Sequence, residues 1–220
     1  AFKTPMIFAV NQLDHEKADY DGTVQEAREH FGSRLVVMQY PLQQGAGFHE
    51  IVDVLRMTLY KFHDTGGKPE KKPIPDAERE RAELLHKELV EAVAGNDETL
   101  MEKYFDKGEL DEEEMIDGLK KAMIKRDLFP LFCLSAERNM GSGRLMGFID
   151  MVCPSANEMP GQPIGQGKRL DCRPDGPTVL FVYKTMTEPH VGELSYFKVY
   201  SGVVKSGMEL WNSTTKTMEK

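Results

Sequence analysis

The sequence predicts an α/β domain that carries an α+β insert and is followed by the beginning of an all-β barrel domain. Two short apolar runs, Met6–Val10 and Phe129–Leu134, are each bounded by polar residues, which is typical of buried parallel strands. Amphipathic helical segments separate these runs, which favours an α/β arrangement. After Pro177 the apolar period changes to two and turn signals recur, which indicates short antiparallel strands.

The chain opens with a β-α-β pattern. The first apolar run is the first strand, and Leu35–Tyr40 is expected to be the second. Between them the sequence predicts a helix over Thr23–Phe31, with Thr23 as its N-cap and Gly32 as its stop signal.

Residues 33–125 have a different character, and we expect an α+β insert there. Ile51–Phe62 shows some alternation of apolar and polar residues, as exposed antiparallel strands do. Gly66–Pro75 is rich in Gly, Pro and Lys and is expected to be a loop. Three helices follow, and the last starts at Asp111 with Glu114 at the capping-box spacing. Their expected ranges are 76–94, 100–105 and 111–126.

The second apolar run leads into a predicted helix over Gly141–Val152. We expect its inward-facing residues to be Leu145, Met146, Phe148, Ile149 and Val152. Ser155–Pro177 is rich in Gly, Pro and Gln and is interpreted as a linker. The strands expected after it are Thr178–Met186, Val191–Tyr200 and Val203–Ser213. The expected parts of the chain are therefore an α/β domain over 1–155, a linker over 156–177, and the start of a barrel or sandwich over 178–220.

The all-β segment is too short to close on itself, so its sheet is expected to have open edges. Unpaired strand edges recruit other chains. We therefore expect the chain to dimerise or swap strands through these edges, or to be poorly ordered at its C-terminus.

Composition limits the class of protein. The 220 residues carry a formal net charge of −8, which argues against nucleic-acid binding by the whole surface but allows a local basic patch. No apolar run approaches the ~20 residues of a membrane helix, and residues 1–5 lack the apolar stretch of a signal peptide. Three Cys and thirteen Met suit a reducing compartment. We expect a cytoplasmic protein without a membrane partner.

The tetrapeptide Asn11-Gln12-Leu13-Asp14 directly follows the first predicted strand. Ligands of open α/β sheets bind at the carboxyl ends of the strands. A carboxylate such as Asp14 can accept two hydrogen bonds there, from the ring N–H and the exocyclic amine of guanine, which adenine cannot match. Taken alone, an Asn-x-x-Asp sequence is also typical of an ordinary turn at a strand end.

A second segment, Ser135-Ala136-Glu137, also follows an apolar strand and precedes a helix. The small side chain of Ala136 allows its backbone N–H to approach a guanine carbonyl oxygen. Ser135 can hold the Asp14 carboxylate in place. Together, in this order, the two segments predict a guanine-base pocket formed by Asn11, Gln12, Asp14, Ser135, Ala136 and Glu137.

Other candidate motifs give weaker evidence of function. The chain contains no phosphate-binding Gly-x-x-x-x-Gly-Lys-Ser/Thr motif, and no catalytic triad or metal site is predicted. Gly165-Gln166-Gly167-Lys168 lies in the predicted linker and is interpreted as flexible chain, and Asp19-Tyr20-Asp21-Gly22 as a helix-capping turn. The glutamates of Asp76–Glu91 and Glu109–Glu114 are expected to form a solvated helix face or, alternatively, a docking surface for a basic partner.

The chain resembles the bacterial elongation factor G family of translational GTPases. The strongest stretch is Lys184–Ser213, which is similar to the opening of that family's second domain. Leu134–Ala136 with Asn139–Gly141 resembles the last guanine motif, and Pro154-Ser155 resembles the end of the following helix. Glu98–Tyr104 resembles part of the insert in the family's GTPase domain.

This resemblance implies a partial P-loop-type GTPase domain with GTP or GDP as its ligand. The phosphate-binding and switch segments and the Mg²⁺ site would lie before residue 1, so this chain alone is expected not to be catalytic. The family's function is GTP-dependent movement of tRNA and mRNA through the ribosome. The resemblance implies that the insert contacts the ribosomal stalk protein and that the barrel domain contacts small-subunit rRNA.

Two positions differ from the family pattern. Gln12 stands where the family usually has Lys, so that the reach is kept but the cation is lost, and Glu137 stands where an apolar residue is usual. Two alternatives therefore stay open. One is a ribosome-binding paralogue that does not depend on GTP hydrolysis, and the other is a non-enzymatic module whose acidic helices dock a basic protein.

Overall fold

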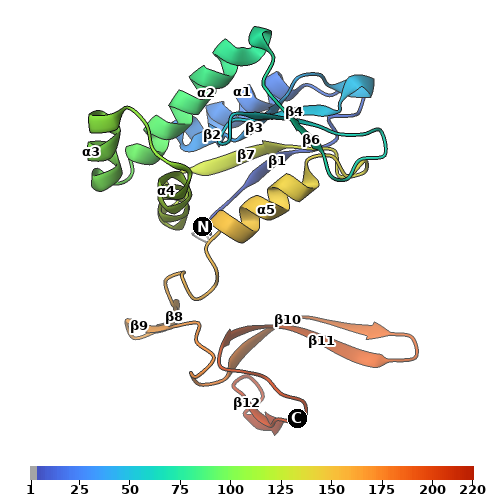
Figure 1. The fold of residues 1–220 in the computed structure, drawn as a ribbon. Helices are drawn as coiled ribbons and strands as arrows, with labels where there is room; N and C mark the ends of the chain where they lie inside the picture. The colour runs from blue at the N-terminus through green and yellow to red at the C-terminus, as the bar shows by residue number, and fades with distance from the viewer. Residues whose placement is uncertain (1–3) are drawn as a thin grey trace. The chain divides into compact units, whose positions relative to one another are not determined.

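The computed structural model describes residues 4–220, so the first three residues of the segment assessed for a signal peptide lie outside it. The chain divides into two units, Ala1–Cys153 and Pro154–Lys220, which are described separately (Figure 1). Within the described residues, every sheet is formed by strands of one unit alone. None of the helices within residues 4–220 is long and apolar enough to cross a membrane.

The first unit is built around a three-stranded parallel sheet in the order β1-β7-β2. Its strands are β1 (Phe8–Val10), β2 (Leu35–Val37) and β7 (Phe129–Cys133). Pro130 lies in the central strand, where it pairs with Val36 of β2, while the pairing with β1 begins one residue later at Leu131. The proline therefore stands at the start of β7, where its missing N–H removes no bond to β1. Figure 1 shows α1 (Tyr20–Phe31) and α2 (Asp76–Ala94) on one side of this sheet and α5 (Ser142–Val152) on the other.

Helix α1 (Tyr20–Phe31) begins three residues earlier than the sequence predicts. Asp19, not Thr23, is its N-cap, because the Asp19 carboxylate accepts a hydrogen bond from the N–H of Gly22 at 3.0 Å. The Thr23 hydroxyl instead donates to the carbonyl oxygen of Asp19 at 2.6 Å. Gly32 ends the helix with φ at 64°, as predicted, and opens the short 3₁₀ helix η1 (Gly32–Arg34).

A second, antiparallel sheet has the order β3-β4-β5-β6. The predicted strand Leu35–Tyr40 is wrong as one element, because it divides at Met38 between the two sheets. The Met38 N–H donates to Leu131 of β7, and its carbonyl accepts from Val54 beside the antiparallel sheet. The strands are β3 (Gln39–Pro41), β4 (Glu50–Asp53), β5 (Thr58–Lys61) and β6 (Glu70–Lys72), with the 3₁₀ helix η2 (Gly45–Gly47) between the first two.

Two expectations for this sheet are wrong. Strand β6 lies within the segment predicted to be only a loop, where it pairs with β5. Strands β4 and β5 are largely buried rather than exposed, because helices cover them. His86 of α2 contacts the carbonyl of Val54 at 2.8 Å, and the Arg144 guanidinium of α5 lies over the Tyr60 ring.

The helices that follow are α2 (Asp76–Ala94), α3 (Glu98–Lys107) and α4 (Glu112–Lys125). The predicted bounds of α2 are confirmed, and α3 is longer than predicted at both ends. The capping box before α4 is confirmed: the Glu114 N–H donates to the Asp111 carboxylate at 2.8 Å, and the Asp111 N–H donates to the Glu114 carboxylate at 3.1 Å.

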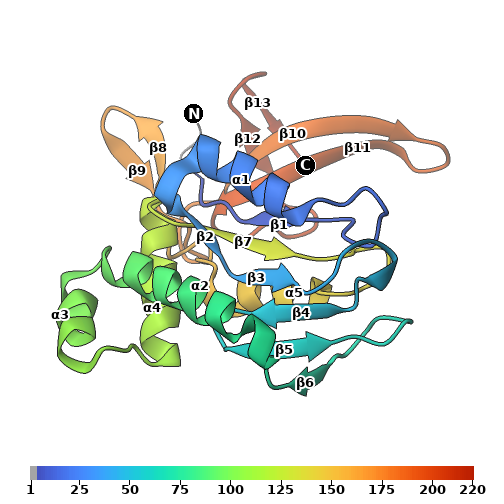
Figure 2. The same ribbon diagram turned by 90° about the horizontal axis from the view of Figure 1, so that it is seen from above.

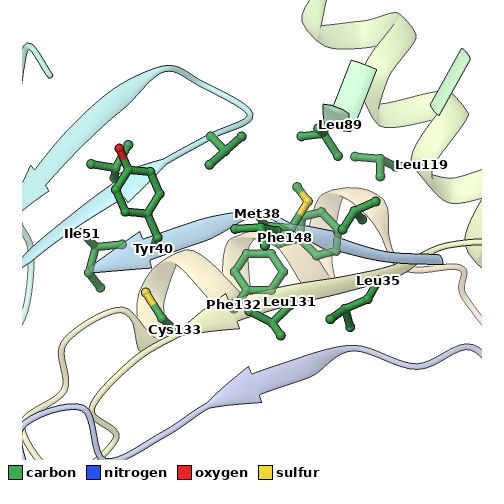
Figure 3. Close-up of a cluster of buried hydrophobic side chains, with 14 of the residues drawn as sticks. Leu35, Met38, Tyr40, Ile51, Leu89, Leu119, Leu131, Phe132, Cys133 and Phe148 are labelled. Atoms are coloured by element: carbon green, nitrogen blue, oxygen red, sulfur yellow. The ribbon is translucent and has the colours of Figure 1, made fainter. Parts of the chain in front are cut away.

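One apolar core joins both sheets to the helices. Figure 3 shows this cluster of buried side chains, which come from β2, β3, β4 and β7 and include Leu89 of α2, Leu119 of α4 and Phe148 of α5 (Ser142–Val152). On α5 the predicted inward face is partly wrong. Phe148 and Val152 are buried, but Met146 is 63% exposed and Ile149 40% exposed. The buried stripe of this helix is therefore narrower than the run of apolar residues suggests.

The second unit consists of three separate antiparallel pairs, and its strands do not close into a barrel within residues 154–220. The pair β8 (Gln162–Gly165) and β9 (Lys168–Leu170) falls in the predicted linker. Its turn has Gln166 and Gly167 at φ of 50° and 72°, so the segment expected to be flexible is a hairpin turn. The other pairs are β10 (Val179–Glu188) with β11 (Gly192–Ser201), and β12 (Leu210–Asn212) with β13 (Thr217–Glu219). The predicted strand Val203–Ser213 is wrong over most of its length, because only Leu210–Asn212 within it is a strand.

Candidate functional site

The two predicted segments of the site lie side by side at the carboxyl ends of β1 and β7. These strands are parallel neighbours, so the chain leaves both at the same edge of the sheet (Figure 2). Backbone bonds continue past the strands: the Leu134 N–H donates to Val10 at 2.9 Å, and the Leu13 N–H donates to Leu134 at 3.4 Å. The sheet thereby fixes the spacing of the two segments.

Asn11 connects the two segments directly. Its side-chain oxygen Oδ1 accepts a hydrogen bond from the backbone N–H of Ala136 at 3.0 Å. This N–H is the group that we expected to face a guanine carbonyl oxygen. A base oxygen at this place would therefore share the N–H with Asn11 or replace Asn11 as its acceptor.

Asp14 is held from two sides. Arg138 Nε lies 3.2 Å from Asp14 Oδ2, and the fully buried Ser135 forms a hydrogen bond with the same carboxylate. The Ser135 hydrogen bond, helped by the Arg138 guanidinium, holds the pKa of the Asp14 carboxyl below its ordinary value although burial acts in the opposite direction. The carboxylate is therefore ionised at neutral pH, and its four lone-pair sites leave room for further donors.

Gln12 and Glu137 lie at the exposed edge of the site. The backbone of Gln12 is left-handed, with φ at 62°. This conformation costs a residue other than glycine about 1–2 kcal/mol. Backbone strain of this kind persists where the surrounding structure enforces it, and it is common at functional sites.

Sequence reasoning missed two supports of the site. Arg138, the partner of Asp14, directly follows the predicted segment, and the available signal was its positive charge at the end of the strand that neighbours the one before Asp14. The loop before β4 is the other support: the Gly45 N–H donates to the carbonyl of Leu13 at 2.7 Å, and the Gln44 side chain accepts from the N–H of Tyr20 at 2.8 Å. Nothing in the local sequence around Gln44 indicates this contact.

The remaining motifs have structural roles. Asp19–Gly22 is a helix-capping turn, as predicted. Among residues 4–220, no group of three or more His, Cys, Asp or Glu side chains is arranged to hold a metal ion. The candidate site is therefore a polar surface at a sheet edge, with one ionised carboxylate at its centre.

No family model matches the chain. The chain is similar to the crystal structure of a protein from Thermus thermophilus, with a TM-score of 0.79 and 26% sequence identity. The similarity covers 95% of this chain and 29% of that protein, so the chain spans less than a third of the length of the protein that it matches. Both units of the chain therefore have counterparts within a larger known structure.

Proposed function

We propose that the chain carries the guanine-base pocket of a translational GTPase similar to elongation factor G. The observation that carries this proposal is the hydrogen bond between Asn11 and the Ala136 N–H, at the same sheet edge as the Asp14 carboxylate that Arg138 holds. In this proposal the first unit is the C-terminal part of a P-loop-type GTPase domain with its insert. The second unit is the beginning of the following β-barrel domain.

The residues present suit a guanine base. The Asp14 carboxylate would accept from the ring N–H and the exocyclic amine, and the Ala136 N–H would donate to the carbonyl oxygen. Adenine presents an acceptor and a donor in the opposite places, so it would leave both protein groups unpaired. Ser135 and Arg138 would keep the carboxylate ionised and oriented. Gln12 and Glu137 would border the base from the exposed side.

Phosphate binding, Mg²⁺ binding and hydrolysis are assigned in this proposal to other segments of the full-length protein. The chain itself would select the base of GTP or GDP and would not perform the chemistry. The full-length protein would use GTP binding to promote translocation of tRNA and mRNA on the ribosome in the cytoplasm.

The proposed partners are the ribosomal stalk protein for the insert and small-subunit rRNA for the second unit. A groove of about 610 Å³ runs between α1 and α2, where Leu84 is 58% exposed and the Arg28–Glu88 ion pair joins the two helices at 3.1 Å. Such a groove suits a protein partner. On β10 and β11, Lys184 and Lys198 lie over tyrosine rings, a combination of cation and aromatic ring that suits RNA.

A second candidate is a ribosome-binding paralogue that does not depend on GTP hydrolysis. Gln12 favours it, because this side chain lacks the cation that the family usually places over the base. The acidic docking module is favoured less. Acidic side chains near α2 and α4 already pair with cations of the chain, including Arg28 with Glu88 and Lys103 with Glu114.

Nucleotide binding by the full-length protein tests this proposal. Fluorescently labelled GDP should bind, and GTP and GDP but not ATP should displace it. Ribosomes should then stimulate GTP hydrolysis if the protein is a translocase, whereas binding without stimulated hydrolysis would favour the paralogue. Failure of guanine nucleotides to compete better than ATP would contradict the base pocket itself.

A further inference from the structure

The loop between β5 and β6, residues 62–69, contacts the turn that follows Ser135. The Gly67 N–H donates to the carbonyl oxygen of Asn139 at 3.1 Å. The Gly66 N–H closes the loop on itself by donating to the carbonyl of His63 at 2.8 Å. Figures 1 and 2 both place this loop at the end of the first unit where β7 finishes. Two segments that are about seventy residues apart in the sequence thus share a backbone contact beside the candidate site.

Gly66 permits this contact because it has no side chain. A β-carbon at Gly66 would overlap the carbonyl oxygen of Arg138, and it would lie 3.0 Å from the carbonyl carbon of Arg138 and 3.2 Å from the carbonyl oxygen of Asn139. These are backbone atoms, which cannot move aside as a flexible side chain can. Gly67 differs, because a β-carbon there would meet no atom within 4 Å.

The turn that Gly66 contacts holds the groups of the candidate pocket. The Arg138 N–H donates to the Ser135 hydroxyl at 3.3 Å, and the Arg138 side chain pairs with Asp14. Ser135 and Met140 exchange two backbone hydrogen bonds that close the turn, at 2.9 and 3.0 Å. A shift of the Arg138 carbonyl would therefore move both groups that orient the Asp14 carboxylate.

We propose that the Gly66–Gly67 loop positions the guanine-recognition turn, so that Gly66 acts as a positioning residue for base selection. This inference rests on the proposed function. It makes the loop and the base pocket one coupled unit: a bound guanine that fixes the turn also fixes the loop. The loop would act only through the turn, without touching the nucleotide.

Gly66→Ala and Gly67→Ala in the full-length protein form a matched pair. Both glycines have positive φ, 71° and 91°, so both variants carry backbone strain, but only Gly66→Ala creates the overlap. Affinities for GDP and for inosine diphosphate, which lacks the exocyclic amine, are measured for both variants. Gly66→Ala should weaken GDP binding about tenfold and lower the GDP preference over inosine diphosphate, because the displaced carboxylate loses its bond to the amine. Gly67→Ala should keep the wild-type preference.

Partial unfolding would weaken the binding of both nucleotides equally and leave the ratio of their affinities unchanged. This ratio therefore separates a positioning role from a general loss of folded protein. If wild type prefers GDP and both variants keep that preference, the positioning role is overturned while the proposed function stands. If wild type binds no guanine nucleotide, the positioning role and the proposed function are both overturned.

Hydrogen exchange on the wild-type protein tests the same coupling without a variant. Addition of GDP should slow deuterium uptake in residues 62–69, and ADP should not. Unchanged uptake on GDP binding would overturn the inference even if Gly66→Ala fails to fold.

Discussion

Asn11 Oδ1 accepts a hydrogen bond from the backbone N–H of Ala136 at 3.0 Å, across 125 residues of sequence. The bond joins the segments that leave two neighbouring parallel strands. The groups of the candidate site are therefore held in place by the chain itself. Asn11 holds the Ala136 N–H, and Ser135 and Arg138 hold the Asp14 carboxylate. Recognition groups that are held in advance lose little further freedom when a ligand binds.

The 220-residue chain alone should not hydrolyse GTP. Phosphoryl transfer needs phosphate-cradling N–H groups, a lysine and Mg²⁺ ligands, and the sequence contains no phosphate-binding motif. Multiple-turnover phosphate release by the purified chain should equal that of the buffer. Release above the buffer level that disappears in Asp14→Asn would contradict this prediction.

The stability of the first unit should depend on pH through Asp14. The pKa of this carboxyl in the folded protein lies below its ordinary value of 3.8, so the ionised form stabilises the fold. This contribution is fully present above about pH 5 and is lost as the pH falls through the lowered folded-state pKa. Urea denaturation should therefore show a stability difference between wild type and Asp14→Asn that shrinks as the pH is lowered from neutral. A difference independent of pH would show that the ionised carboxylate contributes nothing.

Gln12→Lys should strengthen guanine nucleotide binding a few-fold without changing which base is preferred. The lysine stem can lie over the ring and adds a cation, which interacts favourably with an aromatic face by about 0.5–2 kcal/mol. The variant is made in the full-length protein, and its GDP and ATP affinities are compared with those of wild type. A changed base preference would show that position 12 reads the edge of the base rather than its face.

The second unit should associate with other chains. Its β10–β11 hairpin exposes large apolar side chains, among them Phe181 at 58% and Tyr183 at 61%. A two-stranded hairpin is at best marginally stable by itself. Light scattering of the 220-residue chain should show dimers or larger species that decrease in Phe181→Glu. A monodisperse monomer with strong hydrogen-exchange protection over Val191–Ser213 would contradict this expectation.

Helices α2 and α4 of the first unit could be predicted well because their signals are local. The capping box of Asp111 with Glu114 is contained within four residues, and the apolar stripe of α2 ends at Gly95. The division at Met38 could not be predicted in this way. The run Leu35–Tyr40 has no local break, and only the bonds to Leu131 and Val54 assign its two halves to different sheets.

The site shows the same limit. The proximity of Asn11 and Ala136 could be predicted because both residues follow apolar strands, and parallel strands end at one edge of the sheet. The pairing of Arg138 with Asp14 depends on the conformation of a turn, and that turn rests on Gly66 from a distant hairpin loop. A contact between two backbones leaves little sequence signal beyond a glycine.

The base preference of Asp14→Asn tests the central claim most directly. In the full-length protein, competition by GDP and by xanthosine diphosphate is measured for wild type and for this variant. Asparagine offers a donor where the carboxylate offers an acceptor, and xanthine carries a carbonyl in place of the guanine amine. The variant should therefore shift its preference from GDP toward xanthosine diphosphate, since mismatched buried polar groups cost about 1–3 kcal/mol. An unchanged ratio of the two affinities would show that Asn11–Asp14 is an ordinary turn at a strand end and not a base pocket.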